Sequence, residues 1–103
     1  MMQGDQYRLP IFIKYKDGSH IPAEHLSEIE LTIGGIIKTM SEGSITYDAE
    51  KQLFYALITQ KETFLLRGKV NSQLRIKFIG EGDVVGIDLG QIDIAVSLSK
   101  VVL

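Results

Sequence analysis

The sequence contains no cysteine and no long apolar run. Without cysteine the chain forms no disulfide framework and offers no thiolate ligand to a metal, which is typical of proteins made in a reducing compartment. Its first residues have neither the basic start nor the apolar stretch of a signal peptide. We therefore expect synthesis in the cytoplasm, without membrane insertion or signal-directed secretion.

Neither sign of charge is in large excess. The 11 Lys and Arg residues and the 13 Asp and Glu residues are interspersed along the chain, and the formal net charge is −2. Nucleic-acid binding needs a positive face that neutralises a row of phosphates. Nucleic acid is therefore an unfavourable partner.

Residues suited to catalysis or metal binding are also scarce. The two histidines, His20 and His25, lie in one predicted loop, and no Gly-x-Ser-x-Gly elbow supplies a nucleophile. They lack the further ligands that zinc needs, and the spacing of Asp83, Asp88 and Asp93 fits no calcium loop. We predict no catalytic, cofactor-binding or metal site, and hence no enzyme.

The sequence does have the composition of a folded domain. Of its 103 residues, 45% are hydrophobic and 23% are charged. A chain of this length buries about 65% of the surface that it exposes when unfolded, which is enough for one core. We predict a single domain over residues 1–103.

The dominant periodicity is two, which places alternate side chains on opposite faces of a strand. Pro10 marks the first predicted strand as an edge strand, and Gly90 sits where the apolar parity of the last one shifts, as in a β-bulge. Residues 97–103 are apolar enough to pair with a sheet, but their pattern assigns no element. The predicted strands cover residues 7–15, 28–33, 36–40, 44–47, 52–58, 69–78 and 84–94.

Several turns are marked by local sequence signals. Gly34-Gly35 predicts a hairpin with a type I′ turn, which needs positive φ at both positions. Thr59-Gln60-Lys61-Glu62 has the form of a capping box and predicts one helical turn over residues 61–65, crossing between sheets. Residues 21–25 form a loop or a single helical turn, and residues 80–83 form a turn.

About seven short strands separated by turns, with at most one or two short helical turns, predict an all-β protein. The expected architecture is an immunoglobulin-like antiparallel β-sandwich. A small barrel is the alternative.

The aromatic residues leave two interpretations open. Core packing is favoured because they lie within the predicted strands, whereas an exposed cluster would indicate carbohydrate binding. They are Tyr7, Phe12, Tyr15, Tyr47, Phe54, Tyr55, Phe64 and Phe78.

Six segments, spanning most of the chain, carry a resemblance to a known family. They are Gly4-Asp5, Lys16-Asp17-Gly18-Ser19, IELTIGG at residues 29–35, Thr46-Tyr47-Asp48, LITQKET at residues 57–63, and Asp83-Val84-Val85-Gly86. In their order the chain resembles the N-terminal immunoglobulin-like domain of phage upper baseplate (receptor-binding assembly) proteins. It also resembles a group of small uncharacterised prophage proteins of Gram-positive bacteria.

The resemblance implies a non-enzymatic structural protein of a phage or prophage, in a tail, baseplate or neck. Its expected partners are other phage structural proteins, with a homo-oligomer as a further possibility, and with no nucleic acid or membrane. It would be cytoplasmic when synthesised from a prophage and part of the virion if assembled. A carbohydrate or cell-wall ligand-binding β-sandwich module is the alternative function.

Overall fold

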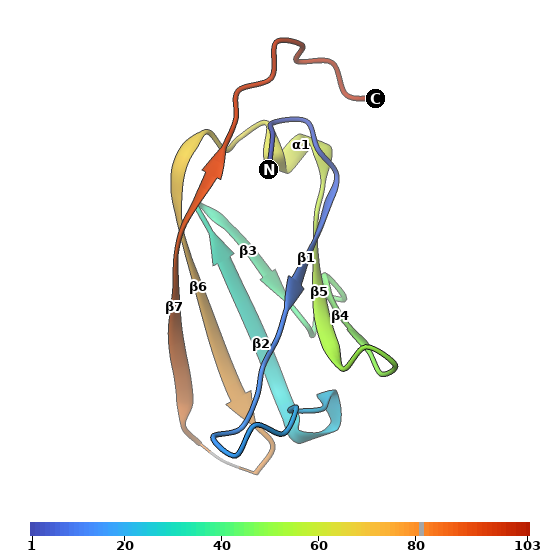
Figure 1. Cartoon of the computed structure of the whole chain (residues 1–103), viewed down its shortest axis with the longest axis vertical. Helices are drawn as coiled ribbons and strands as arrows, with labels where there is room; N and C mark the ends of the chain where they lie inside the picture. Colours follow the sequence, from blue (N-terminus) through green and yellow to red (C-terminus); the bar gives the residue numbers. More distant parts are fainter. Residues whose placement is uncertain (81) are drawn as a thin grey trace.

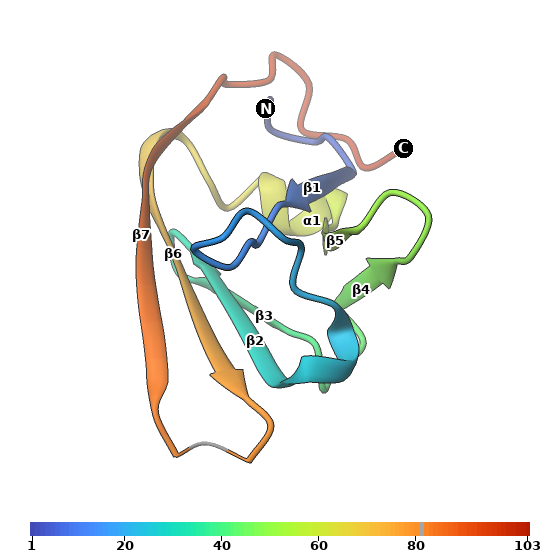
Figure 2. The same ribbon diagram turned by 60° about the horizontal axis from the view of Figure 1, so that its bottom comes forward.

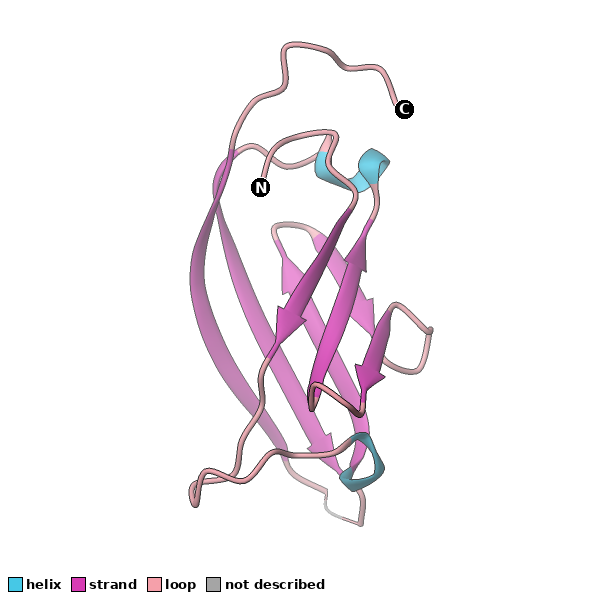
Figure 3. Cartoon of the chain, turned by 45° about the vertical axis from the view of Figure 1, so that its right-hand side comes forward, coloured by secondary structure: helices cyan, strands magenta, loops and turns pink. Residues whose placement is uncertain are grey.

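The computed structural model describes residues 1–80 and 82–103, which form seven strands and two short helices (Figures 1 and 3). Both helices are far too short to cross a bilayer. The helices are a 3₁₀ turn, η1 (Ala23–His25), and α1 (Gln60–Thr63). The strands are β1 (Tyr7–Ile11), β2 (Leu26–Ile33), β3 (Ile36–Thr39), β4 (Ile45–Asp48), β5 (Leu53–Ile58), β6 (Gly68–Phe78) and β7 (Val84–Ile94).

The strands form two antiparallel sheets rather than a barrel. One sheet has the order β1-β5-β4, and the other has the order β3-β2-β6-β7. Figure 2 shows the sheets as two layers, with β1 opposite β6 and β7. The predicted all-β sandwich is confirmed.

The topology has the immunoglobulin arrangement, in which strands A, B, E and D form one sheet and C′, C, F and G form the other. Here β1, β5 and β4 take the places of B, E and D, while β3, β2, β6 and β7 take those of C′, C, F and G. Among the described residues, no strand takes the place of A. The free edge of β1 and the free edge of β7 therefore lie on the same side of the sandwich.

The core lies between the layers. Leu31 on β2, Leu74 on β6 and Phe54 on β5 are almost completely buried in one cluster. A smaller cluster near α1 joins Ile33, Ile58, Leu66 and Ile94. On β6 the buried side chains alternate with exposed ones, as the periodicity predicted.

The Gly34-Gly35 hairpin is present, but its turn type is not the predicted one. Ile33 pairs with Ile36, so the two glycines form the whole turn. Gly34 has φ +59°, whereas Gly35 does not have a positive φ. Positive φ at the first position alone is typical of type II′, and the type I′ prediction is wrong.

The first strand is shorter than predicted. Ile11 and Ile13 point inward, as the alternation over residues 7–15 required, but β1 ends at Ile11. Its partner β5 begins at Leu53, so the pairing ends opposite Phe54. The chain instead closes a small hairpin, in which Ile21 N–H donates to Ile13 O. Pro10 does lie on an edge strand.

The capping box is confirmed in both directions. Glu62 N–H donates to Thr59 Oγ1 at 3.3 Å, and Thr59 N–H donates to Glu62 Oε1 at 3.0 Å. The helix that follows covers residues 60–63, one residue earlier than predicted at its start, and it leads from the smaller sheet to the larger one. The hydrogen bonds of the capping box therefore fix where the chain passes from one sheet to the other.

The β-bulge of the last strand is also confirmed. The register between β6 and β7 shifts at Ser72/Gln73, opposite Gly90, which has φ +81°. Gly90 N–H donates to Asp88 Oδ1 at 2.8 Å. The predicted turn over residues 80–83 includes Glu81, which lies outside the described residues.

Candidate functional site

A groove of about 440 Å³ runs along the open side of the sandwich, between β1 and its continuation on one wall and β6 and β7 on the other. Apolar side chains dominate its lining. The lining residues are Leu9, Pro10, Ile11, Phe12, Ile13, Lys14, Ser72, Leu74, Ile87, Leu89 and Ile92.

The β7 wall of the groove is an apolar sheet face that nothing in the described chain fully covers. Ile87 on β7 pairs with Leu74 on β6, so the two side chains share one face of the sheet. Leu74 is 2% exposed, whereas Ile87 is 40% exposed and Leu89 is 44% exposed. The second layer therefore covers β6 and the Ile94 end of β7, but it leaves Ile87 and Leu89 partly exposed.

Phe12 lies at the β1 wall of the groove, and its position differs from the sequence-based prediction of core packing. Core packing is the favoured prediction for the aromatic residues, but the side chain of Phe12 is 63% exposed. Ile11 and Ile13, on either side, take the two inward positions. Strand parity therefore turns Phe12 outward and adds an apolar ring to the mouth of the groove.

The charged residues of β7 itself are acidic, and they lie on its outer face, away from the groove. Asp88 and Asp93 lie on the strand, which has no lysine or arginine of its own. Asp93 forms an exposed ion pair of 3.3 Å with Lys69 on β6, and Asp88 caps the bulge. The described residues contain no cluster of three or more potential metal ligands, so Asp83, Asp88 and Asp93 are not gathered into one site.

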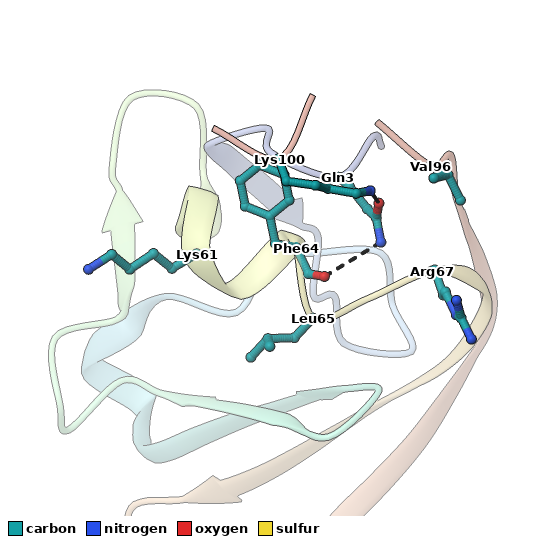
Figure 4. A pocket seen from close by; sticks show the side chains of 7 residues that line it. All are labelled: Gln3, Lys61, Phe64, Leu65, Arg67, Val96 and Lys100. Atoms are coloured by element: carbon teal, nitrogen blue, oxygen red, sulfur yellow. Dashed lines mark hydrogen bonds between the residues drawn. The ribbon is translucent and has the colours of Figure 1, made fainter. Parts of the chain in front are cut away.

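A second cavity, of about 730 Å³, lies beside α1 and is lined by Gln3, Lys61, Phe64, Leu65, Arg67, Val96 and Lys100. Its three cationic residues do not converge. Figure 4 shows Lys61 and Arg67 pointing away from one another, while Lys100 reaches Gln3. Anion binding needs donors directed at one point, so this cavity is not a formed anion site.

The histidines have no catalytic arrangement around them in the described chain. Nδ1 of His25 lies 2.8 Å from the hydroxyl of Tyr15, an exposed contact. His20 is half-buried, and its Nδ1 has no hydrogen-bond partner among the described residues. No carboxylate hydrogen-bonds to either ring among the described residues, so neither histidine has the oriented-base geometry that nucleophilic catalysis requires.

The aromatic side chains are spread over the molecule. Phe54 is buried, and Tyr47 packs on it with ring centroids 4.7 Å apart. Tyr15 stacks on Phe78 at 6.2 Å, and Arg8 covers the ring of Tyr55 at 4.3 Å. The core-packing prediction holds for Phe54 and for Tyr47 and Phe78, which pack against the core. It is wrong for Phe12, Tyr7 and Tyr15, whose side chains are 63%, 37% and 38% exposed.

Sequence reasoning identified the strands that border the groove but not the groove itself. The alternation of Val85, Ile87 and Leu89 correctly gives an apolar face to β7. Whether another strand covers that face depends on the strand order, which alternation does not report. One signal was available in the sequence. Matching the predicted strands in order to the strands of an immunoglobulin domain would have shown that strand A has no counterpart.

No protein-family model, curated protein or solved structure matches this chain.

Proposed function

We propose that this protein is a non-enzymatic association module that binds other proteins through the groove between β1 and β7. In the cell it would be a structural component of a phage or prophage tail, baseplate or neck. The observation that carries the proposal is the partly exposed apolar face of β7, because an edge strand with such a face is a template for adding a further strand.

The apolar side chains alone do not account for stable association. Val85, Ile87, Leu89 and Phe12 are 47%, 40%, 44% and 63% exposed. Full burial of one such side chain contributes about 1.5–3 kcal/mol relative to full exposure, so covering four half-exposed ones gives on the order of 4 kcal/mol. Association costs at least about 4 kcal/mol in lost translation and rotation. Backbone hydrogen bonds from an added strand must supply the remainder.

The phage assignment rests on the family resemblance, two of whose segments pack against each other. Gly4 N–H donates to Thr63 Oγ1 at 2.9 Å, which joins the first of these segments to the end of LITQKET. Gly4 also has φ +86°, and a Cβ there would meet the Phe64 ring at 2.9 Å. These contacts fix the N-terminal turn against the end of α1.

The alternative function, carbohydrate or cell-wall binding, has less support. It requires several exposed rings on one concave surface, and only Phe12 contributes a ring to the groove lining.

Light scattering of the purified protein over a concentration series tests the association role. We expect a defined oligomer that forms as concentration rises. Mass spectrometry of purified phage particles from the producing strain tests the phage assignment, with the chain expected at a fixed copy number. A strict monomer that is also absent from particles would overturn the proposal.

A further inference from the structure

We propose that β7 of one copy of this chain pairs antiparallel with β7 of a second copy, about a two-fold axis at Ile87. The inference rests on the proposed function and deepens it, because it names the partner, the strand that binds and the register. Two observations carry it, the properties of the sheet edges and the fit of β7 to itself.

The edge of β7 differs from the other three sheet edges of the described chain. Those edges are β1, β3 and β4, which have five, four and four residues, and β1 also contains Pro10. β7 has eleven residues, with no proline and no lysine, and its bulge at Gly90 leaves residues 84–88 in regular pairing. Proteins commonly protect a free edge by shortening it or by placing lysine or proline on it. The first half of β7 has none of these protections and is open to pairing.

The described chain also leaves this edge uncovered. β7 pairs with β6 on one side only. Figure 1 shows β7 at the left of the molecule with no ribbon beyond it, while residues 96–103 leave its end toward the right. Gln3 holds that segment there by accepting from Ser97 N–H at 3.2 Å. Pairing of β7 with a second copy therefore breaks none of these contacts.

The two-fold axis determines which side chains meet. Antiparallel copies of one strand are related by an axis perpendicular to the sheet, so their inner faces lie on the same side. Val85 and Ile87 belong to the inner face, and Leu89 lines the groove. With the axis at Ile87, this residue lies opposite its own copy, and Val85 lies opposite Leu89. Each of these half-exposed side chains then gains an apolar neighbour across the contact.

The acidic residue on the outer face selects this register. With the axis at Ile87, Asp88 of each copy lies opposite Gly86 of the other, and the two carboxylates are only diagonal neighbours. An axis at Asp88 would place the carboxylates directly opposite each other, which is destabilising. An axis at Gly86 would place Leu89 beyond the start of the second copy's strand, at Val84. The axis at Ile87 avoids both faults.

The contact is self-limiting. Each copy has one long unprotected edge in its described residues, and the pairing uses it in both copies, so assembly stops at two. The larger sheet extends past β1 on the β7 side, so each groove opens toward the axis (Figure 2). In the pair, the two grooves face each other and form one apolar space. We expect a closed dimer rather than a ring or a filament.

Engineered cysteines test the register, because the chain has no cysteine of its own. Opposite residues of an antiparallel pair have Cα atoms about 4.5–5.5 Å apart, a distance that a disulfide can span. After mild oxidation, we expect Ile87→Cys alone to give a disulfide-linked dimer on a non-reducing gel. Ile37→Cys, 55% exposed on the β3 edge, is the matched control and should give at least about tenfold less product.

A mixed cross-link sharpens this test. Val85→Cys and Leu89→Cys, carried on copies with tags of different size, should form a linked pair of mixed size. Each variant alone should give at least about tenfold less product, because neither residue lies opposite its own copy in this register. A register other than the proposed one reverses this pattern.

Opposite charges at Gly86 test the contact without cysteines. Gly86 has no positive φ, and an added Cβ would meet nothing within 4 Å. Gly86→Lys places a cation opposite Asp88 of the second copy, whereas Gly86→Asp places an anion there. Two such pairs form in each dimer, so we expect the Kd to be roughly tenfold lower for lysine than for aspartate. Folding alone favours the reverse order, because Gly86 pairs with Arg75 within the chain.

Gly35→Lys and Gly35→Asp control for net charge in that comparison. Gly35 is also a glycine without positive φ and with open space around it, but it lies in the turn between β2 and β3. These two variants should differ in Kd by less than about threefold, since they lie outside the contact and salt screens distant charges.

Light scattering of the native chain should reach the mass of a dimer and stay there as concentration rises. A mass that grows past the dimer, linked product from Ile87→Cys no greater than from Ile37→Cys, or equal Kd values for the two Gly86 variants overturns the pairing of β7 with itself. In each of these cases the protein still associates, and the proposed function stands. A native chain that is monomeric at every concentration also overturns this inference, and the phage-particle measurement then decides the proposed function.

Discussion

At the scale of single residues, Gly34 holds a position that only glycine fits, for two separate reasons. Its φ of +59° lies in the left-handed region, and an added Cβ would come within 2.7 Å of Leu66 Cδ2. Leu66 belongs to the small core cluster and has little room to move. The turn geometry and the packing of the core therefore both exclude a Cβ atom at residue 34.

We predict that Gly34→Ala lowers the free energy of unfolding by about 1–3 kcal/mol, because it adds backbone strain and a clash. Gly35→Ala is the matched control. Its Cβ would meet nothing within 4 Å and its φ is not positive, so its effect should stay within about 0.5 kcal/mol. Urea denaturation of the two variants checks this, and equal losses would refute the explanation.

The ion pair between Lys38 and Glu62 joins β3 to the start of α1. Lys38 is 8% exposed, and its Nζ donates to Glu62 Oε1 at 2.6 Å. Burial raises the pKa of Glu62, but the hydrogen bonds from Lys38 and Thr59 outweigh that effect and hold the pKa below its ordinary value. The local sequence predicted the Thr59–Glu62 half of this arrangement. The Lys38 half depends on tertiary packing and was not predictable.

A carboxyl whose pKa is lowered by folding stabilises the folded state at pH values above its pKa in the unfolded chain, which is near 4.5. This stabilisation is lost as the pH falls through the lower pKa of the folded state. We predict that Glu62→Gln costs about 1–3 kcal/mol at pH 7, since it leaves Lys38 buried without its anion. The difference from native should shrink below about pH 4.5. Lys38→Met, which removes the cation instead, should cost less, and denaturant titrations at several pH values test both statements.

At the scale of elements, β7 shows how far alternation predicts structure. Its bounds, residues 84–94, and its bulge at Gly90 followed from parity alone. Parity reports which side chains share a face but not what lies opposite, so the exposure of Ile87 and Leu89 was not predictable. The early end of β1 has a similar cause, since a strand stops where its partner stops.

We predict that Leu89→Lys weakens self-association at least tenfold, equivalent to about 1.4 kcal/mol, because it places a charge in the contact. Folding should be little affected, since Leu89 is 44% exposed and the lysine stem can cover the same surface. Leu57→Lys on β5 is the control, with a similar exposure of 40% outside the groove lining. Sedimentation of both variants decides the matter, and equal weakening would place the contact elsewhere.

At the scale of the whole molecule, the two layers form a sandwich with one open side. Seven strands were predicted and seven are described, but their immunoglobulin places run from B to G and leave that of A empty. Strand number follows from local patterns, whereas strand order requires knowledge of which edges meet. The groove is a property of that order, and the proposed association role depends on it.

The most direct test of this account is hydrogen exchange of the native protein at low and high concentration. If copies associate through the open side, amides of residues 84–94 gain protection as concentration rises, while the β3 edge at residues 36–39 exchanges unchanged. Exchange at residues 84–94 that is independent of concentration while the protein associates, or protection confined to β3, would contradict the account.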